Sequence, residues 1–105
     1  MSLKELKNKS IHFMGIGGIG MSALAHLLAH RGYQVSGSDM SLNGNTERLH
    51  RLGIHIILGH DPSNLDGKDA VVVSTDIKED NPELQEARSR HLPVFHRADV
   101  LGFLM

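Results

Sequence analysis

The chain has 105 residues, a length typical of one domain with one hydrophobic core. Its 11 lysines and arginines nearly balance its 12 aspartates and glutamates, so it lacks the basic footprint of proteins that bind nucleic-acid phosphates. It has no cysteine, which excludes disulfides, thiolate metal sites and a cysteine nucleophile. Its apolar runs are too short for a signal peptide or a membrane span. We therefore expect a soluble cytoplasmic domain whose partners include neither nucleic acid nor a membrane.

The first predicted elements are a strand and a helix separated by glycines. Residues 1–10 form a polar lead, of which residues 1–3 look like an expression scar and are left out of the fold prediction. The apolar run over residues 11–16 predicts a buried parallel strand. From Ile19, apolar residues recur at helical spacing until the typical helix end at Arg31 and Gly32. The domain is expected to span residues 11–105.

Strands and helices continue to alternate along the rest of the chain. The strands are predicted over residues 33–39, 54–58, 70–75 and 92–96, with the β-branched run 70–75 as the central one. The helices are predicted from a cap at Asn43 or Asn45 to Gly53, from Pro82 onward, and over residues 98–105. Leu49 and Leu52 are expected to face inward, and Leu84, Ala87 and His91 are expected to lie on one face of the helix that starts at Pro82. The alternation predicts βαβ units with parallel strands.

The string MGIGGIGMS lies between the first strand and the first helix. It contains the pattern Gly15-x-Gly17-x-x-Gly20 and a further glycine at Gly18. A turn of this kind points backbone N–H groups and the positive end of a helix at one spot, which suits a phosphate or pyrophosphate. Gly15 allows the turn, Gly17 and Gly18 allow close approach of the anion, and Gly20 allows the helix to pack on the strand. Ser22 offers a further hydroxyl donor in the first turn.

Asp39 ends the second predicted strand, nineteen residues after Gly20. An acid in this place accepts hydrogen bonds from ribose hydroxyls in Rossmann domains. The fold predicted from these features is α/β, a Rossmann-like three-layer domain with a mainly parallel five-stranded sheet. The alternative is that the glycines serve packing alone and that Asp39 caps a turn. These residues do not separate NAD from another nucleotide diphosphate, because both carry a pyrophosphate and a ribose.

Six strings along the chain carry a resemblance to a known family. They are IHFMGIGGIGMSALA, GYQVSGSD, LGH, VVVST, NPEL and PVFHRADVL, in this order from Ile11 to Leu101. Together they resemble the N-terminal domain of the Mur ligases, and most of all the branch that joins L-alanine to UDP-N-acetylmuramate in peptidoglycan biosynthesis. The branch that recycles a murein tripeptide remains an alternative, and so does an NAD(H)-binding regulatory Rossmann module.

The resemblance implies that this domain holds the UDP part of UDP-N-acetylmuramate. The diphosphate would lie at the glycine loop, the nucleoside at the end of the second strand, and the crevice between them would be lined by two further loops. For Ser74 and Thr75 the alternative is a strand-end hydroxyl that bonds to its own backbone. The residues so implied are Gly17, Gly18, Ile19, Gly20, Met21, Ser22, Ser38, Asp39, His60, Ser74 and Thr75.

The resemblance also implies a reaction that needs more than this chain. In the family, ATP phosphorylates the carboxylate of the sugar acid, and the amino group of L-alanine then attacks the acyl phosphate. That chemistry requires a P-loop and Mg²⁺, and the chain contains no G-x-x-x-x-G-K-[ST] motif. We therefore expect no catalytic residue and no bound cofactor here, with ATP and Mg²⁺ used by the ATPase and C-terminal domains of a longer enzyme.

Other polar groups are expected to be solvated rather than functional. His26 and His30 share the spacing of a metal-binding pair but have no third ligand nearby, so no metal site is predicted. An acidic cluster precedes a predicted helix, where negative charge is favourable, and is expected to cap the helix and face solvent. The sequence leaves the role of His96 and Arg97 open. The acidic cluster consists of Asp76, Glu79, Asp80 and Glu83.

Overall fold

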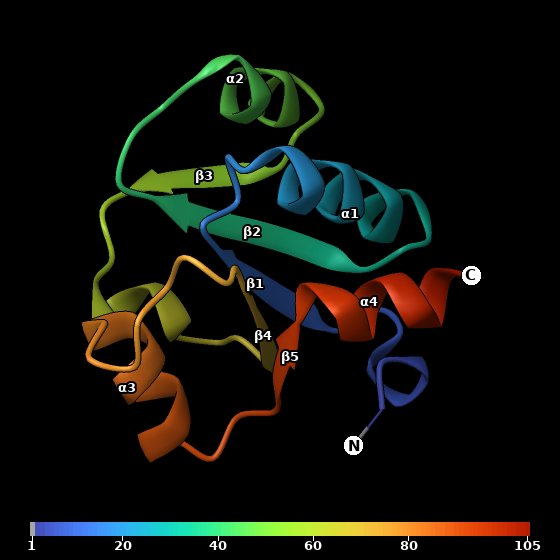
Figure 1. Cartoon of the computed structure of the whole chain (residues 1–105). Helices are drawn as coiled ribbons and strands as arrows, with labels where there is room; N and C mark the ends of the chain where they lie inside the picture. Colours follow the sequence, from blue (N-terminus) through green and yellow to red (C-terminus); the bar gives the residue numbers. More distant parts are fainter. Residues whose placement is uncertain (1) are drawn as a thin grey trace.

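The computed structural model describes residues 2–105 and confirms the predicted α/β fold. Five parallel strands form one sheet in the order β3-β2-β1-β4-β5 (Figure 1). Parallel strands require crossover connections, and helices supply them. The strands are β1 (Ser10–Met14), β2 (Gln34–Asp39), β3 (His55–Leu58), β4 (Ala70–Val73) and β5 (Val94–His96).

Helices cover both faces of the sheet and complete a three-layer domain (Figure 1). Helices α1, α2 and α4 pack on one face, while α3 and a short 3₁₀ helix, η2, pack on the other. Another 3₁₀ helix, η1, precedes β1. The bounds are η1 (Lys4–Leu6), α1 (Ile19–His30), α2 (Gly44–Arg51), η2 (Pro62–Leu65), α3 (Pro82–Ser89) and α4 (Arg97–Leu104).

The central strand β1 separates two hydrophobic clusters. Ile11 and Phe13 belong to the cluster under α1, α2 and α4, whereas Met14 belongs to the cluster under α3 and η2. Alternate residues of a strand point to opposite faces, so His12 lies on the same α3 side as Met14. His12 is completely buried. A buried imidazole in the middle of a sheet requires polar partners.

Several predicted details are wrong at the ends of elements. Leu52 was expected to face inward, but it caps the end of α2 and is 53% exposed. Helix α3 ends at Ser89, and His91 follows it in a left-handed conformation with a φ of 58°, exposed to solvent. The predicted polar loop over residues 59–69 contains η2, whose Leu65 is buried.

The N-terminal lead packs against the domain rather than standing apart from it. Leu3 and Leu6 are buried in the cluster under α1, and the Tyr33 hydroxyl donates to the carbonyl of Leu3 at 2.7 Å. Of the three residues interpreted as an expression scar, Met1 lies outside the described residues. Leu3 contributes to the core, so leaving it out of the fold prediction was wrong. Within residues 2–105, no helix is long and apolar enough to cross a membrane.

One close contact in the sheet fixes the path of the chain after β1. The buried side chain of Ile16 lies directly on the backbone of Gly37 in β2, where an added Cβ would lie 2.6 Å from the Ile16 Cβ. No side chain fits between them. Gly37 therefore allows the loop after β1 to fold down onto the neighbouring strand.

We predict that Gly37→Ala lowers the free energy of unfolding by about 1–3 kcal/mol, because the new methyl group overpacks against Ile16. Urea denaturation measures the change. Gly44→Ala is the matched control, since nothing lies within 4 Å of a Cβ added there. At this first residue of α2 the substitution should be neutral or stabilise by up to about 1 kcal/mol. Equal effects of the two substitutions would contradict the packing role of Gly37.

Candidate functional site

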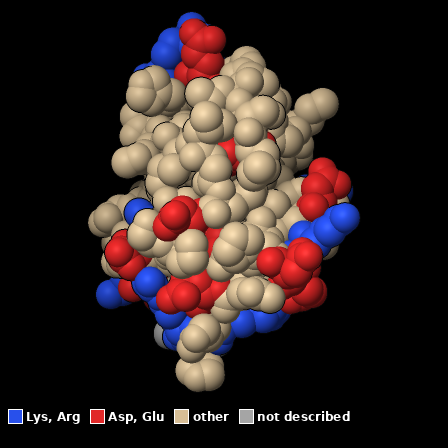
Figure 2. Space-filling model, turned by 90° about the vertical axis from the view of Figure 1, so that its left-hand side faces the viewer, with Lys and Arg blue, Asp and Glu red and all other residues tan. Residues whose placement is uncertain are grey.

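The loops that follow β1, β2, β3 and β4 meet at the carboxyl edge of the sheet. The order β3-β2-β1-β4-β5 reverses direction between β1 and β4, and ligands of open α/β sheets bind at such a switch point. Figure 2 looks onto the side toward which β2 and β3 point. Uncharged residues fill its upper middle, and charged side chains gather toward its lower rim. This face carries no concentrated basic patch.

The glycine loop is attached to β2 through its backbone. The N–H groups of Gly15 and Ile16 both donate to the carbonyl of Ser38, at 2.9 and 3.1 Å. Gly15 has a φ of 81°, a conformation that favours glycine, and a Cβ there would lie 3.0 Å from the Cβ of Ser74. The loop is therefore held between the ends of β2 and β4.

The N-terminus of α1 has backbone donors without a side-chain cap. Its N-cap is Gly18, which offers no capping side chain, and its first turn contains no acidic residue. The N–H of Ser22 donates to the carbonyl of Gly18 at 2.8 Å, so the earlier N–H groups of Ile19, Gly20 and Met21 precede the first helical acceptor. These donors and the helix dipole produce a positive spot that favours an anion.

Arg97 lies across this end of α1. Its side chain covers Gly20, where an added Cβ would lie 2.8 Å from the Arg97 Nη1. Arg97 is the first residue of α4 and is exposed, and within residues 2–105 its guanidinium has no carboxylate partner within 4.0 Å. The structure thus places a cation beside the positive end of α1. An anion bound between them would relieve their mutual repulsion.

Asp39 and two asparagines hold Gly17 from both sides. The N–H of Gly17 donates to Asp39 Oδ2 at 2.8 Å, and the side-chain amides of Asn43 and Asn45 each donate to the Gly17 carbonyl at 3.1 Å. The carboxylate also accepts from the N–H of Ser41 at 3.3 Å. A carboxylate has about four acceptor positions. Asp39 therefore retains capacity for ligand hydroxyls while it fixes the loop.

The other side chains implied by the resemblance lie in different surroundings. Met21 and Ser22 are buried, so Met21 can offer only its backbone N–H to the anion spot. Both donors of Ser22 are engaged within the protein, its hydroxyl with the carbonyl of Ile19 at 3.1 Å and its N–H with the carbonyl of Gly18. The Ser74 hydroxyl accepts from the N–H of Asp76 at 3.3 Å. This is a bond to the local backbone, the alternative to ligand contact that the sequence left open for Ser74. Thr75 is exposed.

Ser38 points away from the crevice into a buried polar cluster on the α3 side of the sheet. Its hydroxyl lies 2.6 Å from Glu83 Oε1 and 3.0 Å from His60 Nδ1. His12 Nε2 lies 3.2 Å from the same carboxylate oxygen, and the side-chain amide of Asn64 donates to Oε2 at 2.5 Å. Ser38 was expected to face a nucleoside, but its hydroxyl is engaged in this cluster.

Glu83 is the centre of the cluster and is completely buried, so the prediction that it is solvated was wrong. Burial by itself raises the pKa of its carboxyl. Hydrogen bonds from His12, Ser38 and Asn64, with the charge of His12, outweigh this effect and hold the pKa below its usual value. Glu83 is therefore ionised at neutral pH. The signal for this role was an imidazole in an apolar strand, which needs a buried partner.

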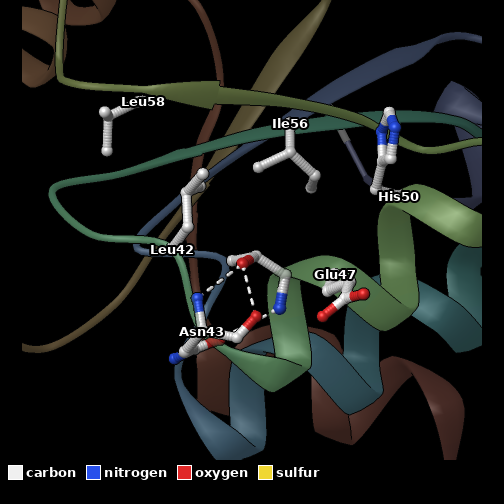
Figure 3. Close-up of a pocket in the computed structure, with 7 residues that line it drawn as sticks. Leu42, Asn43, Glu47, His50, Ile56 and Leu58 are labelled. Atoms are coloured by element: carbon white, nitrogen blue, oxygen red, sulfur yellow. Dashed lines mark hydrogen bonds between the residues drawn. The ribbon is translucent and has the colours of Figure 1, made fainter.

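Two hollows open near the strand ends. One, of about 410 Å³, is lined by Met40 after β2, by His60, and by the loop between β4 and α3, including Asp76, Lys78 and Asp80. The other, of about 560 Å³, lies between α2 and β3, and Figure 3 shows Leu42 and Ile56 extending into it. No sequence feature indicated this second hollow. Its lining residues are Leu42, Asn43, Thr46, Glu47, His50, Ile56 and Leu58.

Exposed apolar side chains lie around these hollows. Ile19 is 86% exposed at the start of α1, and Met40, Leu42 and Leu58 follow the ends of β2 and β3 with 61–70% of their surface exposed. Within residues 2–105 no group of three or more histidines, aspartates or glutamates is arranged to hold a metal ion.

Comparison with known proteins places this chain in a family. The model of the Mur ligase family, catalytic domain, matches residues 10–105. The chain is 53% identical over 95 residues to a UDP-N-acetylmuramate–L-alanine ligase of Phenylobacterium zucineum, covering 90% of this chain and 20% of that relative. The chain thus spans about a fifth of the length of the curated relatives it matches.

Solved structures agree in fold. UDP-N-acetylmuramate-alanine ligase from Thermotoga maritima matches 91% of this chain and 22% of its own, with a TM-score of 0.83 and 38% identity. UDP-N-acetylmuramate:L-alanyl-gamma-D-glutamyl-meso-diaminopimelate ligase from Neisseria meningitides matches 85% of this chain and 28% of its own, with a TM-score of 0.79 and 30% identity. Since the family model covers almost the whole chain, the protein belongs to the Mur ligase family.

Proposed function

We propose that this chain is the UDP-N-acetylmuramate-binding domain of an ATP-dependent ligase that joins L-alanine to the sugar nucleotide in the bacterial cytoplasm. The observation that carries the proposal is the uncapped N-terminus of α1 with Arg97 beside it. The names of the relatives that are 53–54% identical to the chain support the choice of substrate.

The diphosphate would bind at the start of α1. The N–H groups of Ile19, Gly20 and Met21 would donate to its oxygens, and Arg97 would pair with its charge. Gly18 leaves space for the anion, because an added Cβ there would have no neighbour nearer than 3.6 Å. The backbone thus supplies most of the donors, in agreement with the absence of a concentrated basic patch on this face.

The nucleoside would extend from the diphosphate toward the ends of β2 and β3. Asp39 retains acceptor capacity for a ribose hydroxyl or a uracil N–H. Leu42 and Ile56, in the hollow between α2 and β3, offer an apolar surface for a flat base (Figure 3). His60 would face the ligand from the other side of β2.

ATP and Mg²⁺ would bind outside this chain. The 105 residues contain no P-loop motif, and the described part holds no cluster of metal ligands. The curated relatives are about five times as long, so the remaining domains would supply the phosphorylation chemistry. In this proposal the chain binds and orients one substrate and contributes no catalytic residue.

The two alternatives differ in their support. A ligase that takes a murein tripeptide shares the fold and the UDP part of the substrate, but curated relatives that are 53–54% identical to the chain carry the L-alanine name. An NAD(H)-binding module would use the same glycine loop. The family match over residues 10–105 favours a sugar nucleotide over NAD.

We predict that UDP-N-acetylmuramate shifts the backbone amide resonances of residues 18–22 and of Asp39 in a ¹H–¹⁵N NMR titration. Binding should be weak, because part of the site would lie on other domains. UDP alone should shift the same loop resonances, whereas NADH should not. Unchanged resonances at millimolar UDP-N-acetylmuramate, or a response to NADH alone, would refute the proposal.

We predict that Arg97→Gln weakens the binding of UDP-N-acetylmuramate about tenfold, since a hydrogen bond between charged groups is lost. The matched control is Arg31→Gln, which removes the same charge at the opposite end of α1. It should leave the affinity unchanged. The same titration measures both variants. If Arg97→Gln binds as the unchanged chain does, the guanidinium is not a ligand of the diphosphate.

A further inference from the structure

The buried carboxylate of Glu83 determines where the hydrogens of its neighbours lie. An ionised carboxylate only accepts hydrogen bonds. Ser38 Oγ lies 2.6 Å from Glu83 Oε1, so the single hydroxyl hydrogen of Ser38 is donated to that oxygen. The Ser38 oxygen can then only accept from its other neighbour, which is the imidazole of His60.

This constraint defines the tautomer of His60. Its Nδ1 lies 3.0 Å from Ser38 Oγ and 3.5 Å from Glu83 Oε1, and both of these oxygens are acceptors toward it. Nδ1 must therefore carry a hydrogen. In a neutral imidazole only one ring nitrogen does so, and Nε2 is left with a free lone pair.

The other ring nitrogen of His60, Nε2, belongs to a side chain that is 6% exposed. Within residues 2–105, Nε2 makes no hydrogen bond. Every side-chain nitrogen or oxygen that is shut off from solvent there does have a hydrogen-bond partner. Nε2 is therefore reached by solvent. His60 lines the hollow of about 410 Å³ together with the charged residues Asp76, Lys78 and Asp80.

We propose that the buried Glu83–Ser38 pair holds His60 in its Nδ1–H tautomer and so presents Nε2 as an acceptor for a hydroxyl or amide N–H of the sugar nucleotide. Glu83 and Ser38 are positioning residues, because they reach the ligand only through His60. The identity of the ligand rests on the proposed function, whereas the tautomer rests on the contacts of Ser38 and Glu83 alone.

The tautomer can be measured in the protein without ligand. Long-range ¹H–¹⁵N NMR correlations distinguish Nδ1–H from Nε2–H at a pH where His60 is neutral. We expect the Nδ1–H pattern, although unconstrained imidazole side chains prefer Nε2–H. An Nε2–H pattern for His60 in the unsubstituted chain would overturn the proposal, and this result does not depend on the folding of any variant.

A matched pair of variants separates this role from a general effect on the core. Ser38→Ala removes the acceptor of His60, and we expect the Nε2–H form to gain population. Ser36→Ala makes the same change at another buried β2 position, where the hydroxyl lies 2.9 Å from His12 Nδ1 instead. It should leave the His60 pattern unchanged. A pure Nδ1–H pattern in Ser38→Ala would show that Ser38 does not hold His60 in this tautomer.

Binding is the second measurement. Ser38→Ala should weaken the binding of UDP-N-acetylmuramate about five- to tenfold, which corresponds to the loss of one net hydrogen bond. Ser36→Ala should leave the affinity unchanged. If His60 has the Nδ1–H tautomer but the chain binds no UDP-N-acetylmuramate, the proposed function and the ligand of His60 are refuted. The control of the His60 tautomer by Glu83 and Ser38 is then still supported. Binding that is equal in both variants would show that Nε2 is not an acceptor for the ligand.

Discussion

The carboxylate of Glu83 is the interaction on which the α3 side of the sheet depends. Burying an isolated charge is very costly, and the cost falls only when hydrogen bonds and opposite charge replace water. Here the donors come from His12 in β1, Ser38 in β2 and Asn64 in η2, with Glu83 itself on the first turn of α3. Four separate elements must therefore be in place together. This requirement fixes where α3 and η2 sit relative to the strand ends.

The two faces of the sheet consequently have different tasks. On the α1 side, Ile11, Phe13 and Val72 form an ordinary apolar core. On the α3 side, the apolar cluster occupies only part of the sheet, and polar groups fill the part beside β2. The polar part lies directly below the crevice, so its hydrogen bonds determine the orientation of side chains there. Packing alone would hold those side chains less specifically, because apolar contacts have no direction.

Much of the fold follows from local sequence patterns. The glycine loop, the register of apolar residues in α1 and the acid at Asp39 could each be predicted, since they depend on neighbours close in the chain. The role of Glu83 could not. It stands at a helix start, where an exposed acid is favourable, and its partner His12 lies 71 residues away in sequence. Only the pairing of β1 with β2 brings His12, Ser36 and Ser38 onto one face.

In the glycine loop and the first turn of α1, side chains and backbone have different roles. Ile16, Met21 and Ser22 direct their side chains into the core, while the N–H groups at the start of α1 remain available. A backbone donor recognises an anion but not what the anion is attached to. Under the proposed function, discrimination among nucleotides would come from side chains at the strand ends, where Asp39 is hydrogen-bonded to Gly17 and His60 to Ser38. In the proposed function, rigid positioning of these two groups would let a small domain select one nucleotide with few direct contacts.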